Sequence, residues 1–160
     1  MKVPGVQQKV LVSACLTGLA CRYDGRSKPS PRLEALLGGR QMIPVCPEEL
    51  GELGTPRPPA TLSGGDGHEV WAGRAEVVRV EDGASLTAAF ITGAERAYAN
   101  ASDASAAILK ARSPSCGCGE TEIDGAKRPG DGVFAALLKT QGIPVFTDEA
   151  PLDSLDAYEV

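Results

Sequence analysis

Short, nearly continuous runs of apolar residues recur along the chain and predict buried strands. They lie at residues 10–14, 43–45, 106–109 and 143–146. An apolar run without alternation is typical of a strand that is covered on both faces, as in a parallel sheet. A further run at residues 75–80 ends at the Asp82-Gly83 turn and predicts another strand, and a hairpin with the segment around Val70 is one way to pair it.

Between these strands, apolar residues at helical spacing predict three helices. Residues 30–38 combine a serine N-cap, a proline at the first helical position and a closing glycine. Residues 85–102 show the longest amphipathic pattern, and residues 130–142 predict a third helix that ends at a glycine. Residues 47–67 are rich in Pro, Gly, Glu and Thr with little periodicity, and they predict a long irregular loop.

The alternation of strands and helices predicts a three-layer α/β fold. We expect a Rossmann-like, mainly parallel sheet with helices on both faces and right-handed crossovers. A chain of 160 residues without repeats or linkers is expected to form a single domain over residues 1–160. In such sheets the ligand site lies beyond the carboxyl ends of the strands, so candidate chemistry is sought there.

Composition narrows the classes of partner. The chain has 42% hydrophobic residues and a formal net charge of -5, which argues against a broad surface for nucleic acid polymers or anionic membranes. No run approaches the roughly 18 apolar residues of a membrane span, and the first residues form no secretory segment. We therefore expect a cytoplasmic protein whose partner is a small molecule.

Five cysteines are the main candidate chemistry. In a reducing compartment they are expected to be metal ligands, nucleophiles or buried small hydrophobes rather than disulfides. Cys15, Cys46 and Cys116 each follow a predicted strand at the same sheet edge, so these three should converge. Thiolates select zinc, copper(I) or iron-sulfur clusters. Gly117 and Gly119 could let backbone N–H groups approach a cluster, although tight turns explain them equally well.

Other motifs predict less. Residues 63–67 lack the ending of a phosphate loop and predict a flexible loop tip. His68 is the single histidine, and without a second one or a nucleophile elbow it supports no hydrolase site. Trp71 is expected to pack at the base of this loop. Lys110 and Arg112 lead into the third cysteine, where they could balance a cluster, bind an anionic substrate or lie in solvent at a strand end.

Five motifs resemble, in order, those of the thiouracil desulfidase family. They are SACL at 13–16 with Gly18, CRYDG at 21–25, VCPEE at 45–49, PRPPA at 56–60 and KARSPSCG at 110–117. Together they cover nearly the whole chain, which is identified as a member of that family. Thr61 stands where members usually carry an acidic residue, which leaves the substrate preference open.

The resemblance implies a non-redox desulfuration that depends on a 4Fe-4S cluster. A thiolated pyrimidine such as 2-thiouracil would give the oxo base and hydrogen sulfide. Carried over, the cluster ligands are Cys15, Cys46 and Cys116, the same three that the strand ends select. Glu48 corresponds to the acid-base carboxylate and Ser113 to the helper hydroxyl. The iron without a cysteine would bind the thione sulfur while Glu48 takes a proton from the attacking water.

Two cysteines and two other functions stay open. Cys21 belongs to the family pattern without a ligand role and Cys118 is an additional thiol, so either could replace a ligand or form a disulfide after cluster loss. One alternative function is a zinc or iron-sulfur protein whose metal is structural or transfers electrons. The other is a module that binds a nucleobase or carries sulfur as a persulfide.

Overall fold

Two four-stranded sheets form the framework of the computed structural model, which describes residues 8–158. Sheet A has the order β2-β1-β5-β8, and all its strands are parallel. These strands are β1 (Lys9–Ser13), β2 (Gln41–Val45), β5 (Ala106–Leu109) and β8 (Val145–Thr147). The four apolar runs therefore form one parallel sheet, as expected, but the edge strands β2 and β8 are only partly buried.

The two central strands of sheet A are buried except for Lys9 at the start of β1. The side chains of β5 and of Val10, Leu11 and Val12 in β1 have no exposed surface. An apolar run without alternation has this cause, because both faces of the strand are covered. Strand β2 lies at the edge, which is where Pro44, lacking a backbone N–H, is tolerated.

Helices cover both faces of sheet A, so the predicted three-layer α/β arrangement is confirmed. Ile108 and its neighbours on one face pack against α1 (Leu33–Leu37) and α6 (Ser154–Ala157). Leu109 and its neighbours on the other face pack in the same core as α4 (Thr87–Asn100) and α5 (Val133–Thr140). The three predicted helices are confirmed in position, with ends shifted by a few residues. Within residues 8–158, no helix is long and apolar enough to cross a bilayer.

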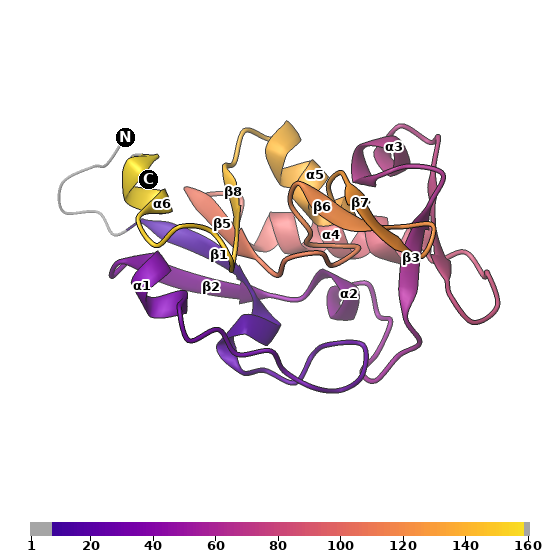
Figure 1. Cartoon of the computed structure of the whole chain (residues 1–160), viewed down its shortest axis with the longest axis horizontal. Helices are drawn as coiled ribbons and strands as arrows, with labels where there is room; N and C mark the ends of the chain where they lie inside the picture. Colours follow the sequence, from indigo (N-terminus) through magenta and orange to yellow (C-terminus); the bar gives the residue numbers. More distant parts are fainter. Residues whose placement is uncertain (1–7, 159–160) are drawn as a thin grey trace.

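A second sheet, of which the sequence pattern predicted only the strand at 75–80, packs beside the first. Sheet B has the order β4-β3-β6-β7 and mixes parallel and antiparallel pairs. Its strands are β3 (Ala60–Ser63), β4 (Glu76–Arg79), β6 (Glu120–Ile123) and β7 (Ala126–Pro129). Figure 1 shows β3, β6 and β7 on the side of the molecule away from α1 and α6. The hairpin of β6 and β7 turns at Asp124 and Gly125, both with positive φ, as two-residue hairpin turns require.

Two predictions for the middle of the chain are wrong. The supposed loop at 47–67 contains α2 (Pro47–Leu50), β3 and the start of α3 (Gly67–Trp71), because such short elements leave no readable periodicity. The hairpin of 75–80 with the segment around Val70, offered as one way to pair this strand, does not form. Val70 lies on α3, and β4 pairs with β3 instead.

Helix α2 is positioned by close contact with α4. A Cβ atom on Gly93 of α4 would lie 1.9 Å from the carbonyl oxygen of Pro47. One on Gly51, directly after α2, would lie 2.2 Å from the carbonyl oxygen of Ala89. Both positions therefore need glycine, and the two glycines let α2 pack directly against α4.

Candidate active site

A pocket of about 330 Å³ opens at the carboxyl edge of sheet A. Its walls come from the loops after β1, β2 and β5, with further residues from sheet B. The proposed ligands and catalytic residues all line it: Cys15, Cys46, Cys116, Glu48 and Ser113. The structure therefore brings together residues that are up to 101 positions apart, at the edge that the strand ends predict.

Each of the three strand-end cysteines lies in a different local backbone structure. Cys15 lies in the 3-10 helix η1 (Ala14–Thr17), which directly follows β1. Cys46 is the N-cap residue of α2, one position after β2. Cys116 lies in the loop after β5 and is 5% exposed. All five cysteines of the chain are free thiols.

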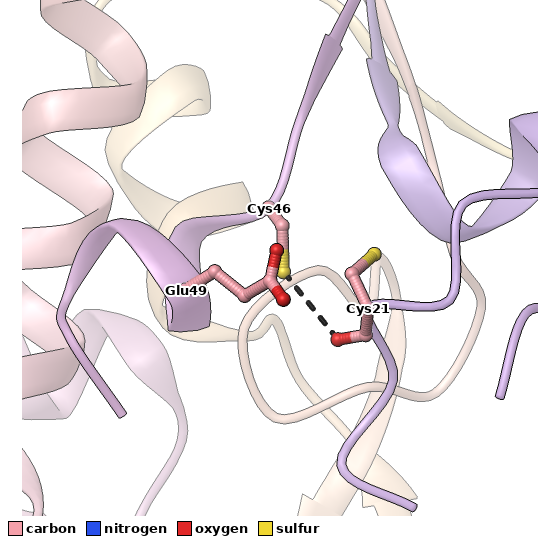
Figure 2. Close-up of side chains that lie close together, drawn as sticks. All are labelled: Cys21, Cys46 and Glu49. Atoms are coloured by element: carbon pink, nitrogen blue, oxygen red, sulfur yellow. Dashed lines mark hydrogen bonds between the residues drawn. The ribbon is translucent and has the colours of Figure 1, made fainter. Parts of the chain in front are cut away.

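Cys21 lies among these thiols as well. It is buried and lines the pocket, and the Cys46 Sγ lies 3.7 Å from its carbonyl oxygen (Figure 2). The hydrogen bond with Cys15, together with burial, raises the pKa of Cys21 to about 11. The hydrogen bond with Cys21 and burial raise the pKa of Cys46, and burial raises that of Cys116 to about 12. The metal-free site therefore favours protonated thiols, and a thiophilic cation would replace their protons.

Glu48 is bound through both carboxylate oxygens. Arg57 donates from Nε to Oε1 over 3.0 Å, and Ser115 donates from Oγ to Oε2 over 3.2 Å. The side chains of Glu48 and Arg57 are 16% and 6% exposed, so this ion pair is largely shielded from water. Two partners fix the orientation of the carboxylate at the pocket wall, which is what an acid-base group needs.

Arg57 connects Glu48 to the loop that carries Cys21. Its Nη2 donates to the carbonyl oxygen of Cys21 over 2.9 Å, and its Nη1 donates to Gly54 and Thr55. Sequence reasoning quoted the PRPPA motif but gave its arginine no role. The motif itself was the signal, because an arginine between prolines sits on a backbone of restricted freedom.

The two serines before Cys116 have different partners. Ser113 Oγ accepts hydrogen bonds from the backbone N–H groups of Ser115 and Cys116, at 3.2 and 3.1 Å, and so caps the turn into the ligand. Ser115 is 2% exposed, and its hydroxyl is the one that contacts Glu48. Sequence reasoning missed Ser115, although two hydroxyls flanking one proline were the visible signal.

The glycines that follow the third cysteine, Cys116, are required by the local backbone conformation and packing. A Cβ atom on Gly117 would lie 2.5 Å from the carbonyl oxygen of Glu120 and 2.8 Å from that of Ser113. Gly119 has a φ of 79°, in the left-handed region that favours glycine. The tight-turn explanation therefore accounts for both residues.

Lys110 and Arg112 line the pocket, but both side chains already have partners. Arg112 forms two hydrogen bonds of 2.6 Å with the carboxylate of Glu149, and Lys110 donates to the carbonyl oxygen of Ala111 over 3.1 Å. Both residues therefore lie at the pocket wall after β5, as their position after the predicted strand implied.

Four other residues lie outside the described lining of the pocket. His68 pairs with Asp131 over 2.8 Å, and Cys118 Sγ lies 3.6 Å from the carbonyl oxygen of Val145. Trp71 donates from its indole to the carbonyl oxygen of Val133 and packs against the core, as predicted. Thr61 is buried and accepts a hydrogen bond from the backbone of Gly125.

The fold and this pocket define a three-layer α/β protein with a thiol-rich site for a thiophilic metal. Thiolates from three separate segments, with a carboxylate beside them, suit the soft ligand preference of iron-sulfur clusters. A family model described as 2-thiouracil desulfurase matches residues 10–150. The chain belongs to that family, so the resemblance found in the motifs is confirmed.

Two relatives extend over nearly the whole chain. The uncharacterized protein YbbK of Bacillus subtilis (strain 168) is 41% identical over 151 residues, which covers 91% of this chain and 99% of that protein. A solved structure described as the 4Fe-4S-dependent thiouracil desulfidase TudS has 40% identity and a TM-score of 0.78. The match covers 96% of this chain and 100% of that one.

Proposed function

We propose that this chain is a 4Fe-4S-dependent desulfidase that converts a thiolated pyrimidine such as 2-thiouracil into the oxo base and hydrogen sulfide. The observation that carries this proposal is the position of Cys15, Cys46 and Cys116 around one pocket, with the bound carboxylate of Glu48 in its wall. Family membership and the similarity to a desulfidase of that type support it.

The three thiols fit a cluster with one iron not bound by cysteine. When bound, such a cluster supplies a Lewis acid for the soft thione sulfur of the substrate. Cys15, Cys46 and Cys116 would be its ligands. The three cysteines lie on separate segments: in η1, at the start of α2 and in the loop after β5. Ligands from separate segments suit separate irons of one cluster.

Side chains of the protein would position the attacking water and accept its proton. Glu48 takes a proton from the water that attacks the carbon bearing the sulfur. Arg57 keeps the carboxylate in place through Oε1, and the hydroxyl of Ser115 donates to Oε2. Ser113 positions Cys116 through the capped turn.

The substrate is proposed to be a small molecule, because the pocket is a confined cavity. The five free thiols fit a reducing compartment, and we propose a cytoplasmic location on that basis. A nucleic acid polymer and a membrane are not part of the proposal, since the chain carries a net charge of -5.

A turnover assay tests the function. Protein reconstituted anaerobically with iron and sulfide is incubated with 2-thiouracil, and uracil and sulfide are followed by chromatography and a colorimetric sulfide assay. We expect many turnovers per cluster, which Cys46→Ala and Glu48→Ala abolish while the far-UV spectrum stays unchanged. Cys118→Ala is the matched control and should remain active, because Cys118 lies outside the pocket lining.

Other results would replace the proposal. One stoichiometric sulfur transfer followed by silence would indicate a persulfide carrier. A four-thiolate zinc site in anaerobically purified protein, or a cluster with every iron bound by the protein, would indicate a structural or electron-transferring metal.

A further inference from the structure

Cys21, Cys46 and Glu49 form a compact group beside the pocket. Cys21 comes from the loop after η1, Cys46 caps α2, and Glu49 lies in the first turn of that helix. The two Sγ atoms and a carboxylate oxygen all lie within 4.8 Å of one another. Figure 2 shows the Cys46 thiol beside the Glu49 carboxylate, with Cys21 across from them and its carbonyl oxygen toward Cys46.

These distances suit one metal ion. Zinc binds thiolate at about 2.3 Å in tetrahedral geometry, so two sulfurs on one zinc lie roughly 3.8 Å apart. A carboxylate oxygen is an ordinary third ligand, and a water molecule is an ordinary fourth ligand where a protein supplies three. Within residues 8–158, Cys116 belongs to no such compact group, as expected of thiols that bind separate irons of a cluster.

The group is positioned by contacts that need no cluster. Arg57 binds the carbonyl oxygen of Cys21, which fixes this loop next to α2. The side chain of Glu49 receives a hydrogen bond from Thr55 at Oε2, and the residues of the described chain place no hydrogen bond on Oε1. Cys21 is therefore a buried thiol that the proposed cluster does not use, and its Sγ lies within 4.8 Å of the donor atoms of Cys46 and Glu49.

We propose that the cluster-free protein binds one zinc ion through Cys21, Cys46 and Glu49. Because Cys46 is also a ligand of the proposed cluster, the zinc ion and the cluster exclude each other, and this second statement rests on the proposed function. Zinc at this site would keep Cys46 from oxidation while no cluster is bound, and it would have to leave before the cluster is assembled.

Metal binding to the full-length, cluster-free protein under anaerobic conditions tests the proposal. Zinc is titrated against a chromogenic chelator, and cobalt(II) replaces it as a spectroscopic probe. We expect one equivalent of zinc, and cobalt spectra with the thiolate charge-transfer and intense visible bands of a tetrahedral site. Loss of a second-shell partner already weakens metal sites about 10- to 100-fold, so Cys21→Ser should weaken zinc binding at least 100-fold. Glu49→Gln should weaken it less.

A matched pair of variants separates the two sites. Cys21→Ser should lose zinc yet still take up the cluster, with its absorption near that of the wild type, whereas Cys116→Ser should bind zinc normally and lose the cluster. Added zinc should slow cluster assembly in the wild type and in Cys118→Ser, but not in Cys21→Ser.

The proposal is overturned if the wild type binds no zinc, or if Cys21→Ser and Cys116→Ser lose it equally. Neither result bears on turnover of 2-thiouracil. Conversely, a chain without desulfidase activity would still show the zinc titration, so the failures of the two proposals are distinguishable.

Discussion

Arg57 and Cys21 are joined across 36 positions of the chain by a hydrogen bond of 2.9 Å from Nη2 to the carbonyl oxygen. The backbone N–H of Arg57 also donates to the carbonyl oxygen of Tyr23 over 2.6 Å. The same guanidinium binds Glu48. One side chain therefore links the proposed base to the loop that carries the additional pocket thiol.

Replacing Arg57 by Met should affect both stability and activity. The change leaves Glu48 without its partner in a largely shielded position, and breaking a buried ion pair costs about 3 to 5 kcal/mol. We expect the lower end, because Glu48 is 16% exposed. Urea unfolding measures the loss, and the turnover assay should show a lower kcat. Arg74→Met, whose guanidinium pairs with Glu69 on the exposed surface, is the control and should change neither by much.

Replacing each of the two serines before Cys116 by alanine should impair a different property of the protein. Ser115→Ala removes the donor to Glu48, so we expect a lower kcat, an altered pH-rate profile and normal cluster content, with a stability loss of about 1 kcal/mol. Ser113→Ala removes the cap of the turn at Cys116, so its main effect should be faster cluster loss in air. Iron content and kinetics on the same preparations separate the two. Identical behaviour of both variants would contradict these roles.

The cluster-free protein should lose stability in alkali through its thiols. Cys21 and Cys116 have folded-state pKa values raised to about 11 and about 12, because of the hydrogen bond with Cys15 and of burial, respectively. The unfolded chain releases these protons near pH 8.5. The contribution is thus fully present below that pH and is lost as pH rises toward 11 to 12. Urea unfolding from pH 8 to 10.5 should show a shallower decline for Cys116→Ala than for Cys118→Ala.

Gly93→Ala should disturb the site from a distance. The added Cβ would lie 1.9 Å from the carbonyl oxygen of Pro47, so α2 must move away from α4. Overpacking of this kind costs about 1 to 3 kcal/mol. We expect lower cluster occupancy and lower activity together, measured by iron content and turnover. Glu95→Ala, an exposed change on the same helix, is the control. Normal occupancy in Gly93→Ala would show that α2 tolerates the shift.

The sequence predicts the parallel core better than the second sheet. The runs at 10–14 and 106–109 are buried on both faces, so hydrophobicity alone identifies them. Strand β3 has four residues, and its pairing with β4 and β6 is fixed by tertiary contacts that no local pattern records. The turn at Asp124 and Gly125 was a readable hairpin signal.

The candidate site divides in the same way. The carboxyl ends of parallel strands follow from topology, so the convergence of Cys15, Cys46 and Cys116 could be predicted. The contacts of Glu48 with Arg57 and Ser115 join separate loops, and the second spans 67 positions. Only the folded chain shows which of two neighbouring serines faces the carboxylate.

Helix α2 is a single turn that carries Cys46, Glu48 and Glu49. It has only four residues and is wedged against α4 at Gly93, so these side chains share one rigid frame. A rotation of this frame that improves the fit of one metal at Cys46 also redirects the carboxylate of Glu48. The orientation of the Glu48 carboxylate should therefore depend on which metal is bound at Cys46. A protein that binds another metal in place of the cluster would have a misaligned base as well as no cluster.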